Sequence, residues 1–441
     1  MKNELLLTAV MLSGSFSMAQ EVAFEEYDLT NGLHVILHQD NSAPVVAVGV
    51  MYHVGAKDED RTRTGFAHFF EHLLFEGTQN IERGKWFDIV SSNGGMNNAF
   101  TTQDKTYYYE VFPSNSLELG LWMESERLLH PVINEIGVST QNSVVKEEKK
   151  QRLDNAPYGK IMYRTGINPH LFKKHPYGES VIGQIEHLDA AKLEEFIAFK
   201  KKFYNPNNAV LVVTGDFEKL QTKKWIENYF GSIPNTGEKI VRTKIQEEPI
   251  TKAIKVTDYD ANIQLPIKIY AYRTPGMTEK DAYVLDLISS ILTGGKSSRM
   301  YKKMVDEKKT ALQVLAFSDS QEDYGTYIMG ALPMAGINLE TLGKEMDEEI
   351  QKLQNELISK REFDKLQNQI ESRFVSANSN MEGIALSLAN YYLFYKDTGL
   401  INKQIDIYRS ITREDIQRVA RKYLNENQRL DLDYLPENLK Q

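Results

Sequence analysis

The stretch that decides the fold and chemistry of this chain is Thr64-Gly-Phe-Ala-His-Phe-Phe-Glu-His-Leu-Leu-Phe-Glu-Gly77. It contains His68, Glu71 and His72 in the pattern H-x-x-E-H. Residues four apart on a helix lie on one face, so the two imidazoles can reach one metal ion. Glu71 directly precedes His72, which places its carboxylate near that ion without making it a ligand. Thr64 can cap the start of this helix, and Gly77 can end it.

This motif admits two interpretations. The two histidines could belong to a buried helix and simply pair with neighbouring polar groups. Alternatively, they are two of the three protein ligands of a catalytic zinc site, whose fourth position stays open for water. The chain has no Cys, so a third ligand must be a His or a carboxylate. None of the other histidines pairs at this spacing on a predicted helix, which favours a carboxylate.

Composition limits the class of protein. The chain has 441 residues, of which 41% are hydrophobic and 26% charged, as expected for a soluble protein of two or more domains. The net charge of -9 and the lack of a long basic tract argue against nucleic acid and anionic membrane surfaces as partners. Beyond the N-terminus no apolar run is long enough to span a bilayer, so we expect no stable membrane insertion.

Residues 1–19 have the features of a secretory signal peptide. Lys2 is followed by an apolar stretch from Leu5 to Leu12, and Ser17-Met18-Ala19 forms a small-x-small cleavage site before Gln20. The alternative is a first helix of the fold. The order of the three regions favours export, to the periplasm in a Gram-negative cell or otherwise to the exterior.

The order of predicted elements repeats along the chain. Each half runs strand, helix, strands, helices and strand, and the polar stretch 236–250 between them lacks apolar periodicity. We therefore predict an α+β fold of two homologous domains, at 20–235 and 251–441, joined by the linker 236–250. Each domain would be an antiparallel-rich sheet packed by helices. The second domain contains no His and is expected to be metal-free.

A candidate for the third ligand lies in the predicted helix from Val138 to Leu153. It contains Glu147 and Glu148, whose side chains point about 100° apart, so only one can face a site. The pattern alone does not choose between them, and a solvated pair of glutamates is the commoner meaning of such a sequence.

These residues, taken together, resemble the insulinase/pitrilysin family of zinc metallopeptidases. The resemblance rests on H-x-x-E-H, on Gly94-Gly-Met-Asn-Asn-Ala-Phe-Thr101 and on Val145-x-x-Glu148. The branch most similar in pattern includes mitochondrial processing peptidase and bacterial two-domain members. The likeness covers nearly the whole chain after the signal peptide and implies a processing-peptidase-like duplicated fold, with the peptidase site in domain 20–235.

The resemblance implies a role for each site residue. His68, His72 and Glu148 would bind Zn²⁺, and Glu147 would be the exposed neighbour of the third ligand. Glu71 would act as the general base that takes a proton from the attacking water.

The resemblance also implies a substrate-binding strand. Asn98, Ala99 and Phe100 would lie on an edge strand that pairs with the backbone of an extended peptide. An inner strand of the sheet is the alternative for these residues. Strand pairing with a substrate requires an unfolded peptide, so folded proteins should be poor substrates.

The chain departs from the family at three positions. Active members present an Arg and, seven residues later, a Tyr that hold the substrate and the developing oxyanion, but Val305 and Leu312 stand there in this chain. Many relatives carry an acidic residue seven positions before the third ligand, and this chain has Gln141 at that position. We therefore expect a zinc-bearing subunit that works with a homologous zinc-less chain supplying Arg and Tyr, or otherwise with a second copy of itself.

We consider three functions for this sequence. The first is a zinc metalloendopeptidase acting on unfolded peptides. The second is a non-catalytic peptide-binding or assembly subunit of the same family, which Val305 and Leu312 favour and the intact His68, Glu71 and His72 oppose. The third is a thioether lyase that carries H-x-x-E-H. The length, the export signal and the lack of Cys count against it.

Overall fold

The computed structural model describes residues 21–163, 166–235, 240–242 and 245–440. Its first half forms a six-stranded sheet in the order β1-β2-β6-β3-β5-β4. The strands are β1 (Glu25–Asp28), β2 (His34–Gln39), β3 (Val45–Tyr52), β4 (Met96–Thr101), β5 (Thr106–Pro113) and β6 (Ala209–Gly215). The signal peptide predicted at 1–19 lies outside the described residues.

The second half forms a five-stranded sheet in the order β7-β11-β8-β10-β9. Its strands are β7 (Ile254–Asp260), β8 (Ile267–Pro275), β9 (Ala311–Ser320), β10 (Tyr324–Pro333) and β11 (Arg429–Pro436). In each sheet one parallel pair, β2 with β6 and β7 with β11, is followed by antiparallel pairs. The shared order confirms the predicted α+β duplication, while the exact domain boundaries stay predictions.

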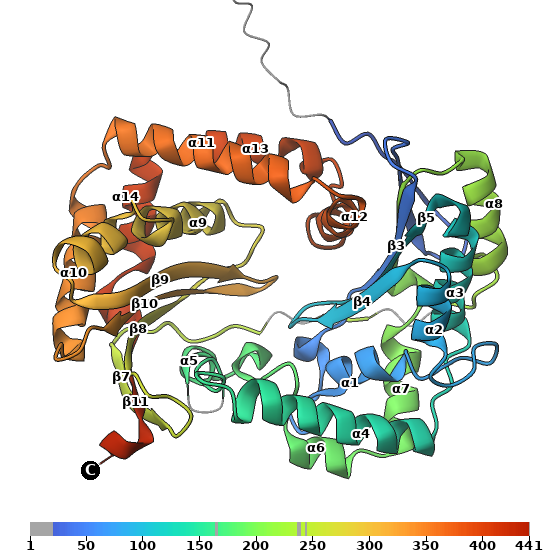
Figure 1. The fold of residues 1–441 in the computed structure, drawn as a ribbon, viewed down its shortest axis with the longest axis horizontal. Helices are drawn as coiled ribbons and strands as arrows, with labels where there is room; N and C mark the ends of the chain where they lie inside the picture. Colours follow the sequence, from blue (N-terminus) through green and yellow to red (C-terminus); the bar gives the residue numbers. More distant parts are fainter. Residues whose placement is uncertain (1–20, 164–165, 236–239, 243–244, 441) are drawn as a thin grey trace, which may run out of the picture.

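Helices cover one face of each sheet (Figure 1). In the first half these are α1 (Phe66–Leu73), α2 (Trp86–Ser92), α3 (Leu117–Leu129), α4 (Glu135–Lys149), α6 (Ile185–Ala190), α7 (Leu193–Phe203) and α8 (Lys219–Phe230). In the second half they are α9 (Lys280–Thr293), α10 (Leu339–Asn355), α11 (Lys360–Ala377), α13 (Leu400–Arg409) and α14 (Arg413–Tyr423). Among the described residues, no helix is both long and apolar enough to cross a bilayer.

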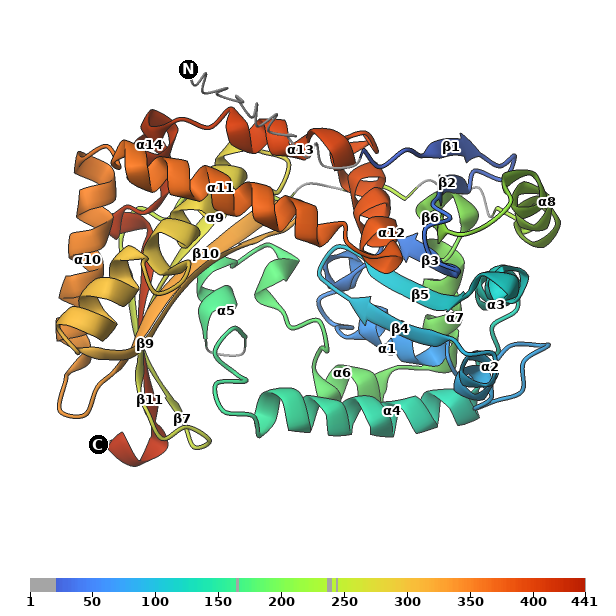
Figure 2. The same ribbon diagram turned by 45° about the horizontal axis from the view of Figure 1, so that its top comes forward.

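The other face of each sheet is covered by a helix from the opposite half. Helix α12 (Met381–Asn390) packs on β3 and β6, where Ile384 and Leu388 join a buried cluster with Ile36 and Val212 (Figure 2). Helix α5 (Ile167–Leu171) packs in the same way against β8 and β11 of the second sheet. Because each half closes the core of the other, their relative position is fixed by apolar packing.

A buried polar junction lies between the halves. The Lys57 ammonium is 2.9 Å from Asp104 Oδ1, 2.6 Å from Glu322 Oε2 and 3.2 Å from Asp323 Oδ2. Asp104 belongs to the β4–β5 turn of the first half, whereas Glu322 and Asp323 form the β9–β10 turn of the second. The junction therefore ties the second half to the turn that follows strand β4.

Histidines complete this junction. His53 Nε2 lies 2.8 Å from Glu322 Oε2, and His175 Nε2 lies 3.3 Å from Asp323 Oδ2. Burial alone would raise the pKa of Glu322 and of Asp323. The hydrogen bonds from the two histidines and the charge of Lys57 outweigh burial and lower each pKa to about 2. Both carboxylates are therefore ionised at neutral pH.

Candidate active site

Helix α1 carries the H-x-x-E-H motif and is anchored at its start by a carboxylate. Glu59 accepts hydrogen bonds from the backbone N–H groups of Gly65 and Ala67, each at 2.7 Å. The prediction that Thr64 caps this helix is wrong, because its hydroxyl lies 2.8 Å from His187 Nδ1 instead. Glu59 satisfies N–H groups that would otherwise lack partners at the buried start of the helix.

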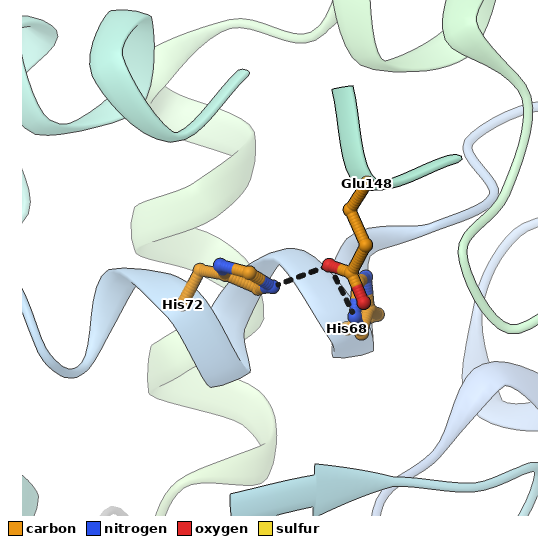
Figure 3. Close-up of side chains that lie close together, drawn as sticks. All are labelled: His68, His72 and Glu148. Atoms are coloured by element: carbon orange, nitrogen blue, oxygen red, sulfur yellow. Dashed lines mark hydrogen bonds and ion pairs between the residues drawn. The ribbon is translucent and has the colours of Figure 1, made fainter. Parts of the chain in front are cut away.

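The two histidines of the motif and one glutamate of α4 converge (Figure 3). Glu148 Oε2 lies 3.1 Å from His72 Nε2 and 3.5 Å from His68 Nε2. The neighbouring Glu147 is exposed and accepts a hydrogen bond from Gln151. Of the two glutamates that the sequence left open, the structure brings Glu148 to the histidines and turns Glu147 to solvent.

The geometry and charge of this triad fit a zinc ion. Donors bound tetrahedrally at about 2.0–2.1 Å lie about 3.3–3.4 Å apart, close to the separations measured from Glu148 Oε2. Burial, followed by the charge of His72, lowers the pKa of His68 to about 4, which keeps that imidazole neutral and able to donate a lone pair. The hydrogen bond with His72 lowers the pKa of Glu148, which keeps its carboxylate ionised. Two imidazoles and one carboxylate are a donor set that catalytic zinc sites use.

Glu71 lies in the same cavity as the triad. Its Oε2 accepts a hydrogen bond of 2.6 Å from Thr101 Oγ1, at the end of strand β4. Burial raises the pKa of Glu71, and the hydrogen bond from Thr101 partly offsets this effect. The cavity has a volume of about 530 Å³ and is lined by His68, Glu71, His72, Asn98, Ala99, Phe100, Thr101, Glu148, Arg152, Leu153, Tyr163, Ser180, Val181 and Ile182.

Strand β4 borders this cavity and is an edge of the first sheet. It pairs with β5 alone among the described strands, with Asn98 opposite Tyr109 and Phe100 opposite Tyr107. This position agrees with the predicted edge strand and rules out the inner-strand alternative for Asn98, Ala99 and Phe100. Backbone groups on the free side of an edge strand can pair with another extended chain. Substrate binding by these residues stays a prediction.

Two contacts within the site were not predicted from the sequence. Arg152, one turn after Glu148, forms an ion pair of 3.0 Å with Glu148 Oε1. The i,i+4 spacing of these residues on a helix was the available signal, although the same spacing also occurs in ordinary surface pairs. The bond from Thr101 to Glu71 had no such signal, because it joins a strand to a helix distant in sequence.

The chain departs from the family pattern at Gln141, Val305 and Leu312, and the structure shows where these three side chains lie. The Gln141 side chain donates a hydrogen bond to the Glu76 carboxylate outside the triad. Val305 lies in the π-helical turn Tyr301–Glu307 and packs against the core of the second half. Leu312 lies on strand β9 and is 47% exposed. Neither aliphatic side chain can donate a hydrogen bond to a substrate.

Two models of known protein families match this chain and define its class. Residues 34–183, which contain the triad and Glu71, match the family model described as "Insulinase (Peptidase family M16)". Residues 190–370 match the model described as "Peptidase M16 inactive domain". This chain belongs to the insulinase family of peptidases, as its sequence pattern suggested.

Individual relatives are similar over nearly their full length. The zinc protease PqqE of Helicobacter pylori is 28% identical over 406 residues, which cover 92% of this chain and 91% of that protein. The uncharacterized zinc protease YmxG of Bacillus subtilis is 24% identical, covering 92% of this chain and 97% of that protein. The crystal structure of a protease from Helicobacter pylori superposes with a TM-score of 0.87 at 27% identity and covers 93% of this chain and 99% of that one. A putative M16-like peptidase from Alicyclobacillus acidocaldarius, with a TM-score of 0.80 at 18% identity, shares the fold over 95% of this chain and 100% of that one.

Proposed function

We propose that this chain is a zinc metalloendopeptidase that hydrolyses extended, unfolded peptides. The observation that carries the proposal is the convergence of His68, His72 and Glu148, with Glu71 in the same cavity. The printed names of its relatives, which are zinc proteases, support the same activity. His68, His72 and Glu148 would hold the ion.

Each group of residues around the cavity would have a separate role in hydrolysis. When bound, zinc would supply a Lewis acid that polarises the scissile carbonyl and lowers the pKa of water. Glu71 would take the proton from the attacking water at its free oxygen and return it to the leaving amine nitrogen. Strand β4 would hold the peptide extended by backbone hydrogen bonds, which orients the scissile bond toward Glu71.

The activity test compares the wild-type chain with Glu71→Gln on a fluorogenic, unstructured peptide. The proposal expects peptide cleavage by the wild type, no measurable cleavage by the variant, and equal zinc content in both. Cleavage by Glu71→Gln at the wild-type rate would contradict the role of this residue. A folded protein of similar sequence to the peptide substrate should be cut far more slowly.

The chain would act as the zinc-bearing subunit of a two-chain enzyme. Val305 and Leu312 stand where active relatives are expected to carry Arg and Tyr, so a homologous zinc-less partner would supply those donors. Co-expression with such a partner should raise the cleavage rate well above that of the single chain. If the isolated chain digests peptides as fast as any two-chain mixture, the partner proposal fails.

A second candidate function is a non-catalytic peptide-binding or assembly subunit of the same family. The aliphatic Val305 and Leu312 favour it, because the site then lacks donors for the oxyanion. Under this alternative neither the single chain nor a two-chain mixture would cleave peptides, while an extended peptide would still bind. Zinc content together with the Glu71→Gln assay separates the two functions.

The proposed location is outside the cytoplasm, in the periplasm or secreted. The sequence pattern of residues 1–19 supports this proposal. Expression of the full-length chain should yield a mature protein whose first residue is Gln20. A mature protein that retains Met1 after fractionation would contradict it.

A further inference from the structure

The Glu71 carboxylate is held from one side by strand β4. Thr101 Oγ1 donates to Glu71 Oε2 at 2.6 Å, and no other hydrogen bond reaches this carboxylate from the described residues. Thr101 is the last residue of β4, whereas Glu71 lies in α1. The contact therefore joins the helix that carries the histidines to the edge strand that borders the cavity.

The neighbouring hydroxyls determine where the Thr101 proton points. Thr106, opposite Thr101 in the β4–β5 pair, is fully buried and donates its own proton to the Val54 carbonyl oxygen at 2.9 Å. The two threonine hydroxyl oxygens lie 3.5 Å apart. Because Thr106 donates its proton to Val54, Glu71 Oε2 at 2.6 Å is a much nearer acceptor for the Thr101 hydroxyl than Thr106 Oγ1 at 3.5 Å. The Thr101 proton is thus directed to Glu71.

This bond fixes one oxygen of Glu71 and leaves the other free. A glutamate side chain has several rotatable bonds, and an unheld carboxylate would sample orientations that point away from the triad. With Oε2 held by Thr101, Oε1 is the oxygen left to face a reacting water. Reaction rates depend steeply on such orientation, because misplacement by about 1 Å can cost about a hundredfold.

We propose that Thr101 is a positioning residue that orients the carboxylate of Glu71 for proton transfer. The inference rests on the proposed peptidase function and deepens it. It also gives β4 a second task, since the strand that would hold the substrate backbone also holds the base. Loss of the hydroxyl should therefore slow turnover without weakening substrate or zinc binding.

The test measures kcat, KM and zinc affinity for Thr101→Val and Thr101→Ser in the full chain, with the partner chain present if activity needs it. Loss of a buried side-chain hydrogen bond is enough to slow the reaction about tenfold or more. We expect Thr101→Val to lower kcat about tenfold or more, with KM within about twofold of the wild type. Zinc affinity, measured by competition with a chromophoric chelator, should not change. Thr101→Ser keeps the hydroxyl and should restore most of kcat.

A matched control is Thr398→Val. Thr398 is buried and donates to the Glu26 carboxylate at 2.5 Å, so this variant loses the same type of hydrogen bond away from the cavity. Its kcat should equal that of the wild type.

Three outcomes would overturn the positioning role: a wild-type kcat in Thr101→Val, an equal loss in Thr101→Ser, or a loss of zinc in either variant. A wild-type chain that cleaves no peptide, alone or with its partner, would instead overturn the proposed function itself.

Discussion

Replacement of Lys57 by Met tests how strongly the polar junction holds the two halves together. The ammonium contacts three carboxylates within 3.2 Å, and the Lys57 and Asp104 side chains are only 8% and 4% exposed. Methionine keeps most of the buried stem but leaves these carboxylates facing one another without their cation. Removal of one partner from a buried ion pair costs about 3–5 kcal/mol.

The expected loss lies at the lower end of that range. Glu322 and Asp323 are 24% and 22% exposed and keep their histidine partners, so water and the imidazoles compensate part of the lost charge. We therefore expect Lys57→Met to lower the free energy of unfolding by about 3 kcal/mol. Asp104, the most buried carboxylate of the junction, also keeps hydrogen bonds from the Tyr177 hydroxyl and the Glu322 N–H.

Urea unfolding measures this loss. Tryptophan fluorescence reports the first half, where all three Trp lie, and far-ultraviolet circular dichroism reports both halves. Coincident transitions would justify a two-state analysis. The control Lys360→Met removes an exposed ion pair with Asp364, and its stability should stay within error of the wild type. A loss in Lys57→Met no larger than that of the control would show that the Lys57 ammonium does not stabilise the contact between the two halves.

Three further outcomes follow from the structure. Glu59→Ala leaves two buried N–H groups of α1 without acceptors and should lower the free energy of unfolding by about 2 kcal/mol in the same urea assay. Glu322 and Asp323 have folded-state pKa values lowered to about 2, so their contribution to stability is present above the unfolded values near 4. Stability measured against pH should therefore fall as the pH drops from about 4.5 towards 2, and less steeply in Lys57→Met. Arg152→Gln should weaken zinc binding about tenfold in chelator competition, the low end for a partner of a metal ligand, because Arg152 is 77% exposed.

Local patterns predicted the centre of the site because its geometry is set within short segments. The H-x-x-E-H spacing on one helix fixes how His68 and His72 face a common point. Glu148 could be chosen over Glu147 only through the resemblance to a family. The two residues are of the same type and differ only in the direction in which their side chains point. The structure separates them because α4 turns one face toward α1 and the other to solvent.

The contacts that surround the site could not be predicted, because each joins segments that only the tertiary fold brings together. Thr64 has the right identity for a helix cap, yet the hydrogen bond with His187 takes its hydroxyl and Glu59 takes its place. Thr101 meets Glu71 because α1 packs beside β4. The junction around Lys57 likewise requires two halves that are separated by most of the chain.

The repeat of elements did predict the α+β duplication, because strand and helix periodicities are local properties. It did not reveal that each half supplies the helix that covers the sheet of the other. The apolar faces of α5 and α12 could pack on any apolar sheet face, so the sequence alone does not show which sheet each helix covers.

We propose that Glu148, rather than its neighbour Glu147, completes a zinc site with His68 and His72. The most direct measurement is the zinc affinity and stoichiometry of the purified chain, compared between Glu148→Gln and the matched control Glu147→Gln. We expect one zinc per chain in the wild type and in Glu147→Gln, and a loss of affinity of at least about a hundredfold in Glu148→Gln. Wild-type zinc binding by Glu148→Gln, or its loss in Glu147→Gln, would show that Glu148 is not the third zinc ligand.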